Sequence, residues 1–171
     1  MDTRLEPWLR GPLPGVPALL QPVAHALVHA REEVPTFVRD VGGAALWARP
    51  AGRASVGFHL QHLAGVLDRL LTYARGEALT EAQLAALRAE GVPDPALTVA
   101  ELVAEFEGGV DRALAQIRAT DPATLIDARG VGREEVPSTV LGLLVHAAEH
   151  TQRHAGQLLV TASVVASAPP P

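Results

Sequence analysis

Apolar side chains recur with the period of an α-helix along four long stretches of this chain, and this pattern constrains the fold most strongly. We expect helices over residues 16–41, 55–75, 98–119 and 138–166. No stretch shows the alternation of a strand of any length. Amphipathic helices of about 20 to 28 residues favour an all-α four-helix bundle, which we expect to be antiparallel.

Several residues mark where these helices begin or bend. Thr98 stands at an N-cap position, and Glu101 follows it in the spacing of a capping box. Ser138 is the expected N-cap of the last helix. Pro22 and Pro35 lie inside the first stretch and should kink or divide it.

The second and third helices are joined by a long connection, in which Thr80 and Gly91 enclose a short helical piece. Residues 127–138 are turn-like and predict a small loop or hairpin. We expect a single helical-bundle domain over residues 1–166 and a disordered tail over residues 167–171.

Missing residue types restrict the chemistry. The 171 residues include no cysteine, which excludes disulfides, thiolate metal ligands and a cysteine nucleophile. All 14 basic residues are arginine, which excludes a Schiff base and a P-loop. The net charge of −5 without a basic cluster argues against nucleic acid as a partner. No apolar run reaches the ~18 residues of a membrane span, so we expect a cytoplasmic protein without a membrane partner.

Histidine is therefore the residue type to examine. His146, His150 and His154 follow one another at four-residue spacing, which places them on one stripe beside the apolar face of the last helix. Two imidazoles at this spacing can hold one metal ion, but a protein site needs a third ligand from another helix. The second helix offers His59 and His62, and a helical wheel places His59 nearer the centre of its apolar face.

Two other histidine patterns predict no site. His25 and His29 form a further pair, but in the stretch that prolines interrupt. Residues 146–150 match the H-x-x-E-H pattern of one class of metalloprotease. That chemistry typically needs a glutamate ligand further along the chain, and none of the 21 residues after His150 is acidic.

Two segments resemble the signature regions of the DinB superfamily: SVGFHLQHLAGVLDRLLTYARGE (55–77) and HAAEHTQRHAGQL (146–158). The resemblance implies a helical bundle in which three histidines hold a divalent metal, often zinc or nickel. The family histidine on the second helix precedes an apolar and a small residue, which matches His62. The H-x-x-x-H pair of the family matches His150 and His154.

The resemblance also implies a function. Members of the family are transferases or isomerases that use low-molecular-weight thiols, or have no known activity. We expect a metal-dependent enzyme, a thiol-dependent transferase or a hydrolase, that acts on a small molecule. The alternative is a non-catalytic, stress-related bundle whose metal site is structural or vacant. A homodimer is expected in both cases. Further side chains expected near the metal or the substrate are His59, His146, Glu149, Arg153 and Gln157.

Overall fold

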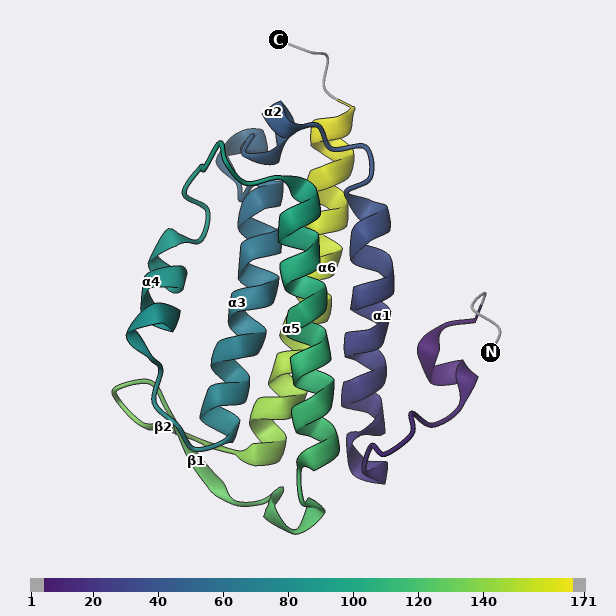
Figure 1. Cartoon of the computed structure of the whole chain (residues 1–171), viewed down its shortest axis with the longest axis vertical. Helices are drawn as coiled ribbons and strands as arrows, with labels where there is room; N and C mark the ends of the chain where they lie inside the picture. The colour runs from purple at the N-terminus through teal and green to yellow at the C-terminus, as the bar shows by residue number, and fades with distance from the viewer. Residues whose placement is uncertain (1–4, 168–171) are drawn as a thin grey trace.

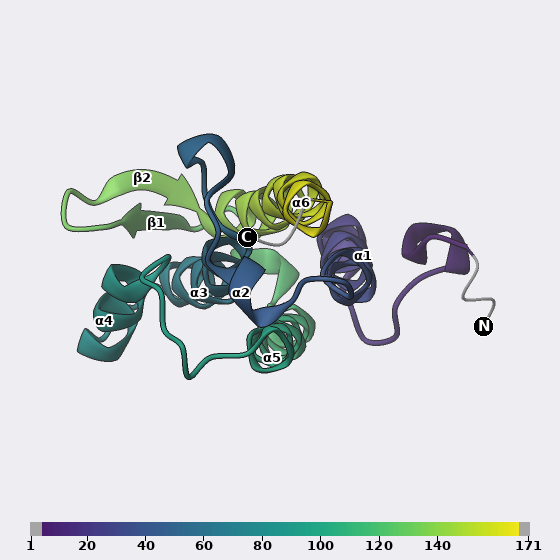
Figure 2. The ribbon, with the colours of Figure 1, turned by 90° about the horizontal axis from the view of Figure 1, so that it is seen from above.

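The computed structural model describes residues 5–167, which form a bundle of four long helices (Figure 1). These helices are α1 (Gln21–Phe37), α3 (Val56–Ala74), α5 (Val99–Ala119) and α6 (Val140–Ala166). Seen along their axes, they occupy the corners of a square, in which α1 and α3 each pack against both α5 and α6 (Figure 2). The predicted all-α four-helix bundle is confirmed.

The helix directions differ in part from the antiparallel arrangement that we expected. In Figure 1, α1 and α6 run in one direction and α3 and α5 in the other. The consecutive long helices α3 and α5 are therefore parallel neighbours. The reason is the long connection predicted between them. It returns from one end of the bundle to the other and carries the short helix α4 (Glu81–Ala89) along the outside of α3.

Helices α3, α4 and α5 begin where the sequence predicts, because a hydroxyl side chain caps each of them. Ser55 caps α3, Thr80 caps α4 in a capping box with Gln83, and Thr98 caps α5 in a capping box with Glu101. Each cap satisfies backbone N–H groups that the first turn of a helix leaves unpaired.

Helix α1 is shorter than predicted, and the prolines act differently. A 3-10 turn over Ala18–Leu20 precedes α1, which begins only at Gln21. Pro22 therefore occupies the first turn, where a missing N–H breaks no helical hydrogen bond. Pro35 lies near the helix end. Helix α1 continues past both prolines to Phe37, so neither of them divides it.

Along the chain, α5 and α6 are connected by a hairpin of two short antiparallel strands, β1 (Ala128–Val131) and β2 (Val136–Thr139). It is the turn-like stretch for which the sequence predicts a small loop or hairpin. Its register pairs Ser138 with Arg129, so Ser138 belongs to a strand. Thr139 caps α6 instead, by accepting a hydrogen bond from a backbone N–H of the first turn. The cap predicted at Ser138 is therefore wrong by one residue.

The core fills the space between the four long helices. Helix α3 is buried on most of its circumference, because α4 and the hairpin flank the side that α5 and α6 leave open. The largest side chains with almost no exposed surface are Phe106, Leu20, Leu27, Leu46, Leu60, Leu63, Leu67, Leu102, Ile117, Leu144, Leu158 and Val34. Each stabilises the fold by roughly 1.5–3 kcal/mol through removal of apolar surface from water.

Helix α6 ends at Ala166 with Ser167 as its C-cap. Residues 168–171 of the predicted disordered tail lie outside the described residues. Across residues 5–167, no helix combines the length and apolar character needed to cross a membrane.

Candidate metal centre

Helix α6 carries histidines on three successive turns, and their surroundings differ. His150 and His154 are half-buried, and their ring centroids lie 4.5 Å apart. His146 continues the row with its ring centroid 5.2 Å from that of His150, but its side chain is 49% exposed. The helix therefore directs one pair of imidazoles toward the bundle and leaves the third at the surface.

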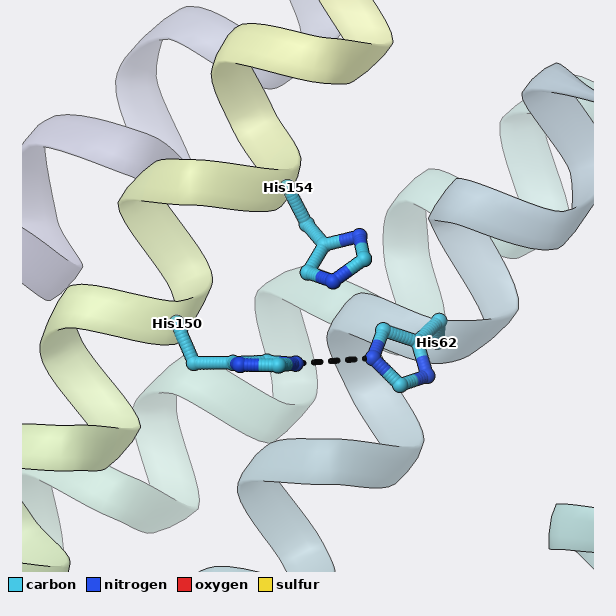
Figure 3. Close-up of side chains that lie close together, drawn as sticks. All are labelled: His62, His150 and His154. Atoms are coloured by element: carbon cyan, nitrogen blue, oxygen red, sulfur yellow. Dashed lines mark hydrogen bonds between the residues drawn. The ribbon is translucent and has the colours of Figure 1, made fainter. Parts of the chain in front are cut away.

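His62 points toward this pair from the neighbouring helix α3 (Figure 3). Its Nε2 lies 2.9 Å from Nε2 of His150, and its ring centroid lies 4.3 Å from that of His154. One ligand nitrogen from each of the three side chains lies within 4.8 Å of the other two. Nitrogens that share a tetrahedral zinc ion at about 2.0–2.1 Å lie about 3.3 Å apart, so this spacing is close to that of a ligand set. We call His62, His150 and His154 the histidine cluster.

His59 lies beside the histidine cluster rather than in it. Its side chain is buried, with 4% of the residue exposed, and its Nδ1 lies 3.3 Å from Nδ1 of His154. Among the described residues, the convergent group contains His62 and not His59. The helical wheel thus favoured His59, which is buried in the core, whereas the family motif favoured His62, which faces the α6 pair.

Burial keeps several of these imidazoles neutral. Burial, together with the neighbouring His62, lowers the pKa of His59 to about 4. Burial, followed by the nearby His62 and His150, lowers the pKa of His154 to about 4. Burial likewise lowers the pKa of His150. Because a metal ion competes with protons for ring nitrogens, imidazoles that are already neutral bind it more readily.

The contacts of His150 also fit a cation. Within residues 5–167, Nδ1 of His150 is buried without a hydrogen-bond partner, while its Nε2 faces Nε2 of His62. Two neutral imidazoles in such a contact either share one proton or direct both lone pairs at a common cation. Three imidazoles without a thiolate suit borderline ions such as zinc or nickel. The residues present therefore fit a divalent metal.

A family model described as the DinB superfamily matches residues 26–158 of the chain. The match runs from α1 into α6 and includes the whole histidine cluster. The chain belongs to the DinB superfamily. No curated protein matches it. Metal binding is general in the DinB superfamily, and the histidine cluster of this chain can hold a metal ion.

Two residues around this DinB-superfamily cluster were not predicted. Glu90, which follows α4, contacts Nδ1 of His62 at 2.7 Å and accepts a hydrogen bond from Nη1 of Arg69 at 2.6 Å. Phe58 stacks on His62, with ring centroids 5.2 Å apart and planes 11° from parallel. Burial would raise the pKa of Glu90, but its hydrogen bonds to His62 and Arg69 outweigh burial and hold that pKa below 4.5. No local pattern marks Glu90, because it lies 28 residues from His62 along the chain.

The predicted neighbours of the metal lie mainly on the outer side of α6. Arg153 pairs with Glu149, and Glu149 also lies 3.5 Å from His146. His146, Glu149 and His150 form a second group of ligand atoms within 4.8 Å, but its first two members are exposed. This second group therefore resembles a solvated helix face more than the enclosed histidine cluster.

An open pocket of about 570 Å³ adjoins His59. Arg153 and Gln157 of α6 line it, together with Arg53 from the turn before α3. Gly156 also lines the pocket, and no atom lies within 4 Å of the place that a Cβ of this residue would take. The pocket can therefore receive a small molecule beside the histidines of this DinB fold.

The histidine pair of α1 lies apart from the cluster. Nε2 of His25 lies 3.1 Å from the carbonyl oxygen of Gly11, and Nε2 of His29 lies 3.3 Å from a carboxylate oxygen of Glu33. Neither residue belongs to a convergent ligand group of the described chain.

We expect the metal-free protein to lose stability as the pH falls from about 6.5 toward 4. The folded-state pKa values of His59 and His154 are about 4, whereas a histidine of an unfolded chain titrates near ~6.5. Between these values the unfolded chain binds more protons than the folded protein, so the free energy of unfolding decreases as the pH falls. Urea unfolding at about pH 7.5 and about pH 5 measures the difference.

Carboxylates do not obscure this effect. The lowered pKa values of Glu32 and Glu90 remove stability only as the pH falls below their ordinary value of 4.5. Replacing His154 by glutamine should make the free energy of unfolding depend less on pH above pH 4.5. A free energy of unfolding that stays constant between about pH 7.5 and about pH 5 would contradict the burial of neutral histidines.

Proposed function

We propose that this DinB-superfamily protein is a metal-dependent enzyme that acts on a small molecule. Its proposed ligands for a divalent ion, zinc or nickel, are His62, His150 and His154. The observation that carries the proposal is the convergence of these three half-buried imidazoles, whose ligand atoms lie within 4.8 Å of one another. Three protein ligands leave coordination positions for water or substrate, as in catalytic sites rather than in closed structural sites.

A divalent ion in such a site supplies Lewis acidity, which lowers the pKa of a bound water or thiol. The chain has no cysteine, so a thiol would enter as a low-molecular-weight co-substrate. With a thiol the proposed reaction is a transfer to a small electrophilic substrate, and with water it is a hydrolysis.

The pocket beside His59 is the proposed substrate site. Arg53 and Arg153 can bind an anionic or strongly polar group there, and Gln157 can donate or accept a hydrogen bond. Neutral His59 lies between this pocket and His154, so it can orient a bound molecule relative to the histidine cluster.

Elemental analysis of protein purified without a histidine tag tests the metal site. We expect about one zinc or nickel ion per chain, removed by a chelator and restored by titration. Failure of both ions to bind in stoichiometric amounts would refute the proposed function.

Catalysis is tested separately, on metal-loaded protein with a panel of small electrophiles and esters, with and without an added thiol. We expect turnover that depends on the metal and is lost in Gly156→Leu, a change that fills the pocket and leaves every histidine in place. A metal-loaded protein with no turnover across the panel would favour the non-catalytic, stress-related alternative.

The homodimer implied by the family resemblance remains a prediction. Light scattering at high protein concentration measures the mass in solution, and a monomer mass would contradict it.

A further inference from the structure

The helix α4 lies outside the bundle, and hydrogen bonds near its two ends attach it to α3. None of its residues, Glu81–Ala89, is buried. At its beginning, Nε2 of Gln83 donates hydrogen bonds to Asp68 at 2.7 Å and to Thr72 at 2.8 Å. Such a helix gains little from the hydrophobic effect, so its polar contacts determine whether it stays docked on α3.

The segment that follows α4 contains one deeply placed side chain. Glu90 is the residue directly after α4, and its side chain is only 7% exposed. A carboxylate at this depth is unfavourable unless it is paired. Here one oxygen accepts a hydrogen bond from Arg69 and the other lies 2.7 Å from Nδ1 of His62. The backbone N–H of Gly91 also donates to Oε1 of Gln61 at 2.8 Å, which fastens the same point to α3.

Gly65 of α3 provides the space for this ion pair. A Cβ on Gly65 would lie 2.6 Å from Oε1 of Glu90 and 2.7 Å from Nη1 of Arg69. Both distances are shorter than a Cβ contact allows, so any larger residue would displace the pair. Gly65 leaves room for the Glu90 carboxylate, and Arg69 binds it. Both therefore help to hold this carboxylate in contact with Nδ1 of His62.

This contact determines which nitrogen of His62 is available. A carboxylate can only accept a hydrogen bond, so the proton of the neutral ring resides on Nδ1. The lone pair then resides on Nε2, the atom that faces His150 at 2.9 Å. A carboxylate on the far nitrogen of a ligand histidine fixes its tautomer and increases its basicity.

We propose that Glu90 is a positioning residue that prepares His62 as a metal ligand, and that metal binding and the docking of α4 are thereby coupled. The inference rests on the proposed metal site. Coupling is reciprocal, since an α4 that docks better when the metal is bound must also increase metal affinity when docked. The long connection between α3 and α5 thus contributes to the site although it supplies no ligand.

The tautomer of His62 is measured first, on metal-free protein, by long-range proton–nitrogen NMR. We expect the wild-type ring to carry its proton on Nδ1, and Glu90→Ala to give a mixture of tautomers. Glu90→Gln should keep the proton on Nδ1, because the amide oxygen still accepts a hydrogen bond. Glu81→Ala, at the other end of α4, is the matched control. A tautomer that is unchanged in Glu90→Ala would overturn the inference.

Zinc affinity and hydrogen exchange test the coupling. Glu90→Ala should weaken zinc binding by ~10–100-fold, and Gly65→Ala should weaken it in the same direction with every polar group retained. Zinc should slow amide exchange across residues 81–91 in wild type and in Glu81→Ala, but not in Glu90→Ala. Equal zinc affinity in wild type and Glu90→Ala would overturn the inference and leave the proposed function intact. Absence of zinc binding in wild type would instead refute the proposed function.

Discussion

Replacing His150 or His154 by alanine is expected to abolish binding of zinc and nickel. The two residues supply two of the three proposed ligands from one rigid helix, and their ring centroids lie 4.5 Å apart. Loss of a direct ligand should exceed the ~10–100-fold cost of removing an outer hydrogen-bonding partner. Competition with a chromophoric chelator measures the affinities, and circular dichroism confirms that each variant remains folded.

The other histidines divide into expected ligands and controls. His62→Ala should lose the metal, whereas His25→Ala should not, because His25 contacts the N-terminal segment at Gly11. His59→Ala should retain it, since His59 lies outside the convergent group. Unchanged affinity in His150→Ala would rule out the site. Loss in His59→Ala with retention in His62→Ala would instead move the third ligand by one turn of α3.

Phe106→Ala is expected to have the largest effect on stability among single substitutions that leave the histidines in place. Phe106 lies on α5 with no exposed surface, surrounded by the core of the bundle. Truncation of a buried phenylalanine removes its transfer free energy and leaves a cavity, at a cost of about 3–5 kcal/mol. Urea unfolding measures the loss.

Leu87→Ala is the control for this change. Leu87 lies on α4 and is 42% exposed, so its truncation should alter stability by no more than about 0.5 kcal/mol. Comparable losses in the two variants would contradict the division between a bundle core and a peripheral α4.

The sequence predicted best those features that depend on neighbouring residues. Thr80 and Thr98 cap their helices as expected, since capping requires only a hydroxyl and the next turn. The cap of α6 was misplaced by one residue, because Ser138 is drawn into the hairpin by pairing with Arg129. The parallel course of α3 and α5 could not be predicted from helical periods, which carry no information on direction.

The residues of the candidate site likewise divide into those that local sequence predicts and those that depend on the path of the chain. The four-residue spacing of His150 and His154 is a local property of one helix, and the family motif supplied His62. Glu90 escaped prediction, because its role depends on the path of a connection that folds back along α3. Nothing in the residues around it distinguishes it from the many exposed carboxylates of the chain.

The histidine cluster joins helices that lie far apart along the chain, since His62 and His150 are separated by 88 residues. Bringing such distant points together costs conformational entropy that increases with the logarithm of the enclosed length. The pairing of α3 with α6 encloses α4, α5 and the hairpin in one ring of chain. Folding must close this ring before the core between α3 and α6 can form. We therefore expect slower folding than in a bundle whose contacts are all between sequential helices.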